Sequence, residues 1–174
     1  PTGIEHGTVT AVEDGKPFEI TTLRKDVETD GRHATVAFSE DWVEDARRRD
    51  FTMNTLLMDI EGNVYDPLGQ GLDDLRARNV AFVGNPPSRI AEDYLRILRY
   101  FRFWALYGKG EPDKDALEAC QAAADKIKDL SRERITQEFF KILSVDEPVS
   151  ILSIMFENNI LKCFSESGYN AELL

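Results

Sequence analysis

The sequence predicts an α+β fold in which a mixed segment, residues 1–83, is followed by an all-helical segment, residues 84–174. Short β-branched and aromatic runs separated by turn residues fill the first segment. Beyond residue 87 the apolar residues recur at helical spacing instead. With 174 residues, 42% of them hydrophobic, the chain is long enough to build a core for one domain or two small ones.

The chain is expected to begin with a β-hairpin and a charged loop. Residues 7–12 alternate weakly, residues 18–23 are rich in Thr, Ile and Phe, and the turn residues Glu13-Asp14-Gly15-Lys16 lie between them. Residues 24–32 are charged without an apolar period, which predicts a mobile loop that leads into a strand over 34–38.

The remaining elements are read from cap, turn and periodicity signals. In the mixed segment they are a helix from the N-cap Ser39 to Arg49, a buried strand over 53–60, a turn at 61–63 into a strand at 64–65, a helix over 72–76 and a strand over 80–83. In the helical segment they are helices over 88–107, 113–130, 132–144 with Ser131 as N-cap, and 148–161.

The helix over 88–107 carries two different faces. Its apolar stripe is predicted to be core and consists of Ile90, Tyr94, Ile97, Phe101 and Trp104. The other side carries Asp93 and the arginines Arg96, Arg99 and Arg102. These charges could form i,i+3 surface salt bridges, each contributing a few tenths of a kcal/mol. Alternatively they line a cleft, where an Asp beside an Arg complements a nucleobase edge and the other arginines suit phosphates.

Charge distribution favours a localised anion site over a general nucleic-acid coat. The net charge is −11, yet residues 76–109 contain seven basic and two acidic residues, a net charge of +5. Cys120 and Cys163 lack metal-ligand spacing, which indicates reduced thiols and a cytoplasmic location. The isolated His6 and His33 are interpreted as structural or incidental. The longest apolar run, Phe103 to Tyr107, predicts no membrane span.

Four motifs in order resemble the bacterial-type (class II) tRNA nucleotidyltransferases, which are the CCA-adding enzymes and their relatives the bacterial poly(A) polymerases. They are Glu19-Ile20-Thr21-Thr22-Leu23-Arg24, Arg48-Arg49-Asp50-Phe51-Thr52-Met53-Asn54, the hinge-like segment Asp66 to Leu75, and Glu92-Asp93-Tyr94-Leu95-Arg96. The resemblance implies a partial nucleotidyltransferase head over 1–83, with a mixed β-sheet and helices. An all-α neck and the beginning of the body would then cover 84–174.

The resemblance also implies the residues of the site and its ligands. Asp93 and Arg96 would face the base, and the other nucleotide-binding residues would be Arg48, Arg49, Asp50, Asn54, Glu92, Arg99 and Arg102. We expect Asp93 and Arg96 to enter one cleft with Arg99 and with Arg48 or Arg49. The ligands would be CTP, ATP and the tRNA 3′ end, with Mg²⁺ as the metal.

The metal-binding part of the family pattern is not found in these 174 residues. Family members hold two metal ions through an Asp-x-Asp pair on a strand that precedes the motifs above. Here Glu19 is the one matching catalytic and metal-binding carboxylate, and the chain starts without Met, so an N-terminally truncated fragment is expected. The literal Asp113-Lys114-Asp115 follows Pro112 and is interpreted as a helix start.

Three functions remain open from the sequence. The first is CCA addition to tRNA 3′ ends, the second is poly(A) polymerase, and the third is a non-catalytic nucleotide- or RNA-binding module derived from such an enzyme. An Asp-x-Asp pair upstream in a longer parental chain would favour an enzyme over the non-catalytic module.

We expect the 174-residue chain alone not to extend a tRNA that lacks its CCA end, because one carboxylate cannot organise two metal ions. The measurement is incorporation of radiolabelled CTP into trimmed tRNA in the presence of Mg²⁺. Incorporation above a no-enzyme control, by material whose mass confirms that it starts at Pro1, would contradict this expectation.

Overall fold

The computed structural model describes residues 8–29, 34–38 and 40–162, and within 25–38 it describes the backbone alone. The strands are β1 (Thr8–Glu13), β2 (Lys16–Thr21), β3 (Arg24–Thr29), β4 (Ala34–Phe38), β5 (Leu57–Met58) and β6 (Val64–Tyr65). The helices are α1 (Trp42–Arg47), η2 (Thr52–Thr55), α2 (Gly71–Ala77), α3 (Pro86–Glu92), α4 (Leu95–Tyr107), α5 (Lys114–Ala123), η3 (Ala124–Asp129), α6 (Arg132–Leu143) and α7 (Pro148–Glu157). The α+β class is confirmed.

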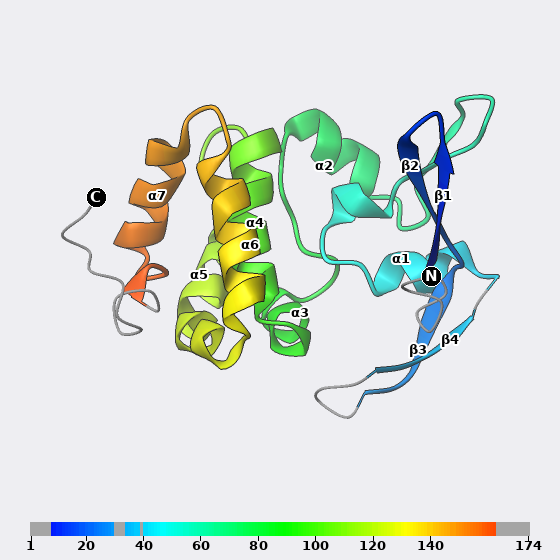
Figure 1. The fold of residues 1–174 in the computed structure, drawn as a ribbon. Coiled ribbons are helices and arrows are strands. Elements are labelled where there is room, and N and C mark those ends of the chain that lie inside the picture. Colours follow the sequence, from blue (N-terminus) through cyan, green and yellow to red (C-terminus); the bar gives the residue numbers. More distant parts are fainter. Residues whose placement is uncertain (1–7, 30–33, 39, 163–174) are drawn as a thin grey trace.

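The β-strands gather at one end of the molecule and the long helices at the other (Figure 1). Each strand pairs antiparallel with one neighbour, so the described residues contain three separate two-stranded sheets. The expected mixed sheet is therefore wrong for this part of the chain. The β1–β2 hairpin is confirmed, and its turn residues Asp14 and Gly15 have φ values of 50° and 77°, as a tight hairpin turn requires.

The charged loop expected over 24–32 is wrong for residues 24–29, which form β3 and pair with β4. Pairing with β4 supplies the hydrogen-bond partners that make a charged segment extended, and composition does not reveal such a partner. The proposed N-cap Ser39 lies outside the described residues. In the structure Asp41 caps α1 and accepts a 2.8 Å hydrogen bond from the Val43 amide.

The buried strand expected over 53–60 is also wrong. Its residues form the end of η2 and the two-residue strand β5, and Ile60 is 98% exposed. The buried residues of η2 are Thr52 and Thr55, and their hydroxyls are satisfied there, since Thr55 donates to the Thr52 carbonyl and Thr52 to the Asp74 carboxylate, both at 2.7 Å. Residues 80–83 form a single antiparallel bridge, between Phe51 and Phe82, in place of the expected strand.

The helix expected over 88–107 is divided into α3 and α4. At the division Asp93 is extended, with φ −156° and ψ 106°. The helix expected over 113–130 likewise becomes α5 followed by η3. Ser131 caps α6 as predicted, and α7 ends at Glu157, before the expected end at 161.

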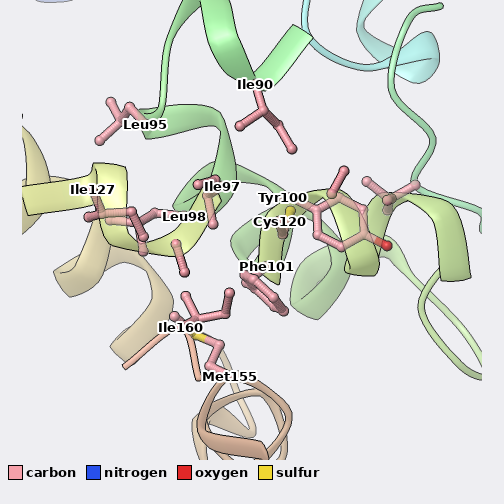
Figure 2. Close-up of a cluster of buried hydrophobic side chains, with 14 of the residues drawn as sticks. Ile90, Leu95, Ile97, Leu98, Tyr100, Phe101, Cys120, Ile127, Met155 and Ile160 are labelled. Atoms are coloured by element: carbon pink, nitrogen blue, oxygen red, sulfur yellow. The ribbon is translucent and has the colours of Figure 1, made fainter. Parts of the chain in front are cut away.

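Helix α4 is the centre of a core that runs through both halves of the chain (Figure 2). Ile97, Leu98, Tyr100 and Phe101 are fully buried on it. Side chains from α3, α5, η3 and α7 surround them, among them Ile90, Cys120, Ile127 and Met155. On another side Tyr100 stacks on Phe82, with ring centroids 5.4 Å apart, and Phe51 packs beside both rings. The predicted apolar stripe is thus core, with Tyr94 and Trp104 partly buried at its margin.

Burial raises the pKa of the Cys120 thiol, and Cys163 lies outside the described residues. No helix in the described ranges combines the length and hydropathy that a bilayer span needs.

Phe101→Ala should lower the free energy of unfolding by about 3–5 kcal/mol, because it leaves a cavity beside α4 where nothing else can fill the space. Phe156→Ala on α7 is the matched control, since that ring is 73% exposed and its loss should change stability by less than about 0.5 kcal/mol. Urea denaturation of both variants measures the difference, and equal losses would contradict the packing described above.

Candidate nucleotide-binding cleft

An open cleft of about 600 Å³ lies where the hairpins and α1 meet the α3–α4 junction and α6. Polar side chains dominate its lining, with six arginines against three aspartates. The lining residues are Thr21, Arg24, Asp45, Arg48, Arg49, Asp50, Asn54, Asp93, Leu95, Arg96, Arg99 and Arg134. With this excess of positive charge the cleft is suited to an anionic ligand.

The break between α3 and α4 places Asp93 in the cleft. Its Oδ1 accepts a 3.1 Å hydrogen bond from the Leu95 amide, which satisfies a donor at the start of α4. Its Oδ2 accepts a 2.7 Å hydrogen bond from Arg134 of α6, 41 residues away. Both carboxylate oxygens are therefore held in place, one by backbone and one by a cation.

Arg96 is held from three directions. Its guanidinium donates to the Glu92 carboxylate at 2.6 Å and to the Arg89 carbonyl at 2.7 Å, and it approaches the Arg48 carbonyl at 3.4 Å. Glu92 also pairs with Arg89. Burial raises the pKa of Glu92, but the hydrogen bonds from Arg96 and Arg89 outweigh burial and bring that pKa below its ordinary value. The position of Arg96 is thus set by the protein alone.

Asp50 connects the strand-bearing half of the chain to α4. It is 8% exposed, and one oxygen accepts hydrogen bonds from the Phe51 amide and the Asn54 side chain, both at 2.9 Å. The other oxygen accepts a 2.7 Å hydrogen bond from Nε of Arg99. Burial raises the pKa of Asp50, but the hydrogen bond from Asn54 and the charge of Arg99 outweigh burial and bring that pKa below its ordinary value.

Asp45 organises a second group of cations. This carboxylate is 5% exposed and accepts two hydrogen bonds from Arg49, at 2.8 and 3.0 Å. It also accepts the Arg24 amide at 3.1 Å and lies 3.8 Å from Arg48. A third donor of Arg49 reaches the Asn54 carbonyl at 3.1 Å. One buried acid of α1 therefore positions the two arginines that follow this helix and the start of β3.

The structure brings most of the predicted site residues together. Asp93, Arg96, Arg99, Arg48 and Arg49 enter one cleft as expected, and Asp50 and Asn54 line it too. Three predicted residues do not line it. Glu92 lies behind Arg96, Glu19 is exposed on β2 opposite Thr10, and Arg102 lies 3.1 Å from buried Glu138 of α6. The guanidinium of Arg102 also lies 4.8 Å from the centre of the Phe103 ring.

Five lining residues were not predicted as site residues: Thr21, Arg24, Asp45, Leu95 and Arg134. Thr21 and Arg24 lie inside the first motif, and Asp45 lies one helical turn before the second. Closeness to a motif is thus the one sequence feature that could have identified these three as site residues. Arg134 had no such signal, because it reaches the cleft through the packing of α6 against α4. Asp93 does not form the i,i+3 salt bridge with an arginine of its own helix that was considered above. Its partner is Arg134 of α6.

The residues that the structure describes do not fit a divalent metal site. In the described ranges no three His, Cys, Asp or Glu side chains gather where they could hold an ion. The interpretation of Asp113 as a helix start is confirmed, because its Oδ1 caps α5 by accepting the Ala116 amide at 2.8 Å. His6 and His33 lie outside the described residues.

Two family models match the sequence. Residues 1–81 match the "Poly A polymerase head domain", and residues 111–166 match the "Probable RNA and SrmB-binding site of polymerase A". A mitochondrial CCA tRNA nucleotidyltransferase 1 of Danio rerio is 45% identical over 157 residues, which cover 89% of this chain and 36% of that protein. A CCA-adding enzyme of Streptococcus gordonii is 45% identical over 143 residues, 81% of this chain and 35% of that protein.

A solved structure shares this arrangement as well. The CCA-adding enzyme of Bacillus stearothermophilus in complex with CTP superposes with a TM-score of 0.79 and 33% sequence identity, covering 91% of this chain and 38% of that one. The chain thus spans about a third of the length of the curated relatives that it matches.

Asp50→Asn should lower the free energy of unfolding by about 1–3 kcal/mol at pH 7, because asparagine cannot compensate the charge of Arg99. The pKa of Asp50 is lower in the folded state, so its contribution is complete above the ordinary value of 3.8 and is lost as the pH falls through the folded-state pKa. The difference between wild type and variant should therefore shrink below about pH 3.8.

Denaturant titrations between pH 7 and pH 2 measure this difference. The control is Asp73→Asn, which removes an exposed partner of Arg76 and should change stability by less than about 0.5 kcal/mol at every pH. A difference for Asp50→Asn that stays constant across this range would contradict the ion pair with Arg99.

Proposed function

Because this chain belongs to the family of poly(A) polymerases and CCA-adding tRNA nucleotidyltransferases, we propose that it is the nucleotide-selecting part of an enzyme that adds CCA to tRNA 3′ ends. The observation that carries the proposal is the placement of Asp93 and Arg96 in one cleft with Arg48, Arg49 and Arg99. The ligands would be CTP, ATP and the 3′ end of a tRNA. A cytoplasmic location remains a prediction.

Asp93 and Arg96 offer the hydrogen-bond pattern that selects C and A. Cytosine and adenine each present an amino donor beside a ring-nitrogen acceptor, whereas uracil and guanine present a carbonyl beside a ring N–H. An Asp acceptor beside an Arg donor complements the first order and opposes the second. Because both side chains are already held by protein contacts, little reorganisation is needed when a base enters.

The other cleft residues suit the rest of a nucleoside triphosphate. Arg48, Arg49 and Arg99 would bind its phosphates, with Asp50 and Asn54 placed for the ribose. Glu92 would act through Arg96, which it holds in position. Arg102 was expected to bind nucleotide, but its ion pair with Glu138 assigns it to the α4–α6 contact in this proposal.

Mg²⁺ is the metal proposed for the transfer reaction of the whole enzyme. The described residues do not form its site, so the function proposed for them is selection and positioning of the nucleotide. A poly(A) polymerase of the same family is the alternative, and a non-catalytic binding module is the third candidate. The poly(A) polymerase would differ from the first proposal in the nucleotides that the cleft accepts. The non-catalytic module would differ in that the longer protein has no transfer activity.

Arg96→Ala should remove about 1–3 kcal/mol of the preference for CTP and ATP over UTP and GTP, because it deletes the donor that faces the base. Isothermal titration of the purified chain with the four nucleotides measures the preference. Binding of CTP and ATP above UTP and GTP by the wild type supports CCA addition, whereas preference for ATP alone indicates a poly(A) polymerase.

Arg76→Ala on α2 is the control, since Arg76 pairs with Asp73 outside the cleft and should leave all four affinities unchanged. An equal loss with every nucleotide in Arg96→Ala would assign Arg96 to a phosphate and contradict base selection.

A further inference from the structure

Arg24 differs from the other five arginines that line the cleft. Each of those has a carboxylate partner: Asp45 for Arg48 and Arg49, Glu92 for Arg96, Asp50 for Arg99 and Asp93 for Arg134. Among the residues that the structure describes, no carboxylate pairs with the guanidinium of Arg24. Arg24 is therefore the one arginine of the cleft lining that has no carboxylate partner among the described residues.

The side chain of Arg24 is nevertheless held in place. Its Nη2 donates a 2.6 Å hydrogen bond to the hydroxyl of Thr8, which in turn lies 3.0 Å from the hydroxyl of Thr21. Its backbone amide donates to Asp45, the acid that also holds Arg49. The start of β3 is thus tied both to the β1–β2 hairpin and, through Asp45 of α1, to Arg49.

One donor of this guanidinium is buried and unused. The Nε atom of Arg24 is shielded from solvent and has no hydrogen-bond partner among the described residues. A buried N–H without an acceptor is unfavourable, and more so when it carries part of a positive charge. The Nη1 end of the same guanidinium is not buried in this way and has no partner among the described residues, so this end is the part of Arg24 that a ligand in the cleft can reach.

We propose that Arg24 binds a phosphate group of the nucleotide in this cleft, which rests on the proposed function. A phosphate supplies the negative charge and the acceptor oxygens that Arg24 lacks. Asp45 holds the backbone of Arg24 and the side chain of Arg49, and both arginines line the cleft, so a polyphosphate can contact cations from β3 and from the segment after α1 together. The base would remain with Asp93 and Arg96, which come from the α3–α4 junction.

A purely structural role for Arg24 requires less than an arginine. The bond to Thr8 uses a single N–H, which a neutral glutamine can also donate. Arg24→Gln therefore removes the charge and retains a donor for the structural contact. Arg24→Lys retains the charge but not the planar, multidentate donor arrangement.

The test is titration of the purified 174-residue chain with tripolyphosphate, CTP and cytidine at low salt. Arg24→Gln should weaken binding of tripolyphosphate and CTP by a similar factor, about tenfold, and leave binding of cytidine unchanged. Arg24→Lys should lose less than Arg24→Gln. Arg76→Gln, an exposed arginine outside the cleft, is the matched control and should bind all three probes like the wild type.

Several results would overturn the proposal. They are unchanged tripolyphosphate affinity in Arg24→Gln, no binding of tripolyphosphate by the wild type, or an equal loss for cytidine. If tripolyphosphate binding depends on Arg24 but CTP binds no better than UTP and GTP, the phosphate site stands and the proposed nucleotide selection fails.

A second measurement tests the phosphate contact in the wild type, so its result does not depend on whether Arg24→Gln folds. In ¹⁵N NMR spectra of the wild type, the arginine Nε–H signal that disappears in Arg24→Lys identifies Arg24. That signal should shift when tripolyphosphate is added. A signal that stays unchanged at saturating tripolyphosphate contradicts a contact with phosphate.

Discussion

Six guanidinium groups line one cleft, and their mutual repulsion is the constraint on which the rest of the site depends. Four carboxylates pair with five of them, and two of these acids, Asp45 and Asp50, are almost fully buried. Burial of a carboxylate is unfavourable unless it is paired and hydrogen-bonded, and both conditions are met here. The acids thus serve the cleft by allowing its cations to lie close together.

These ion pairs also join elements that are far apart in the sequence. Asp50 and Arg99 are 49 residues apart and connect the strand-bearing half to α4, while Asp93 and Arg134 connect the α3–α4 junction to α6. The aromatic rings of Phe51 and Phe82 also pack against Tyr100, and this packing joins the strand-bearing half to α4 as the Asp50–Arg99 pair does. The two walls of the cleft are therefore held by a shared core and by charge pairs at its surface.

The division between α3 and α4 fixes Asp93 in the lining of the cleft. A continuous helix would satisfy the Leu95 amide with a backbone carbonyl, whereas here the Asp93 side chain accepts it. This contact and Arg134 hold the carboxylate beside the positions of Arg96 and Arg99, the pattern of fixed polar groups that discriminates between ligands at low reorganisation cost. Arg24 is the exception among these arginines, because no described carboxylate pairs with it and its buried Nε has no acceptor among the described residues.

The sequence by itself determined the α+β class, the β1–β2 hairpin, the start of α5 and the cap of α6, because these depend on local composition and spacing. Its resemblance to a known family is what pointed to Arg48, Arg49, Asp93 and Arg96. Only the tertiary structure decided the rest. Strand β3 exists through its pairing with β4, the break at Asp93 is supported by α6, and Arg102 turns to Glu138 and away from the cleft. Each of these depends on a partner distant in sequence, and no local pattern encodes which side chain a folded chain will place beside another.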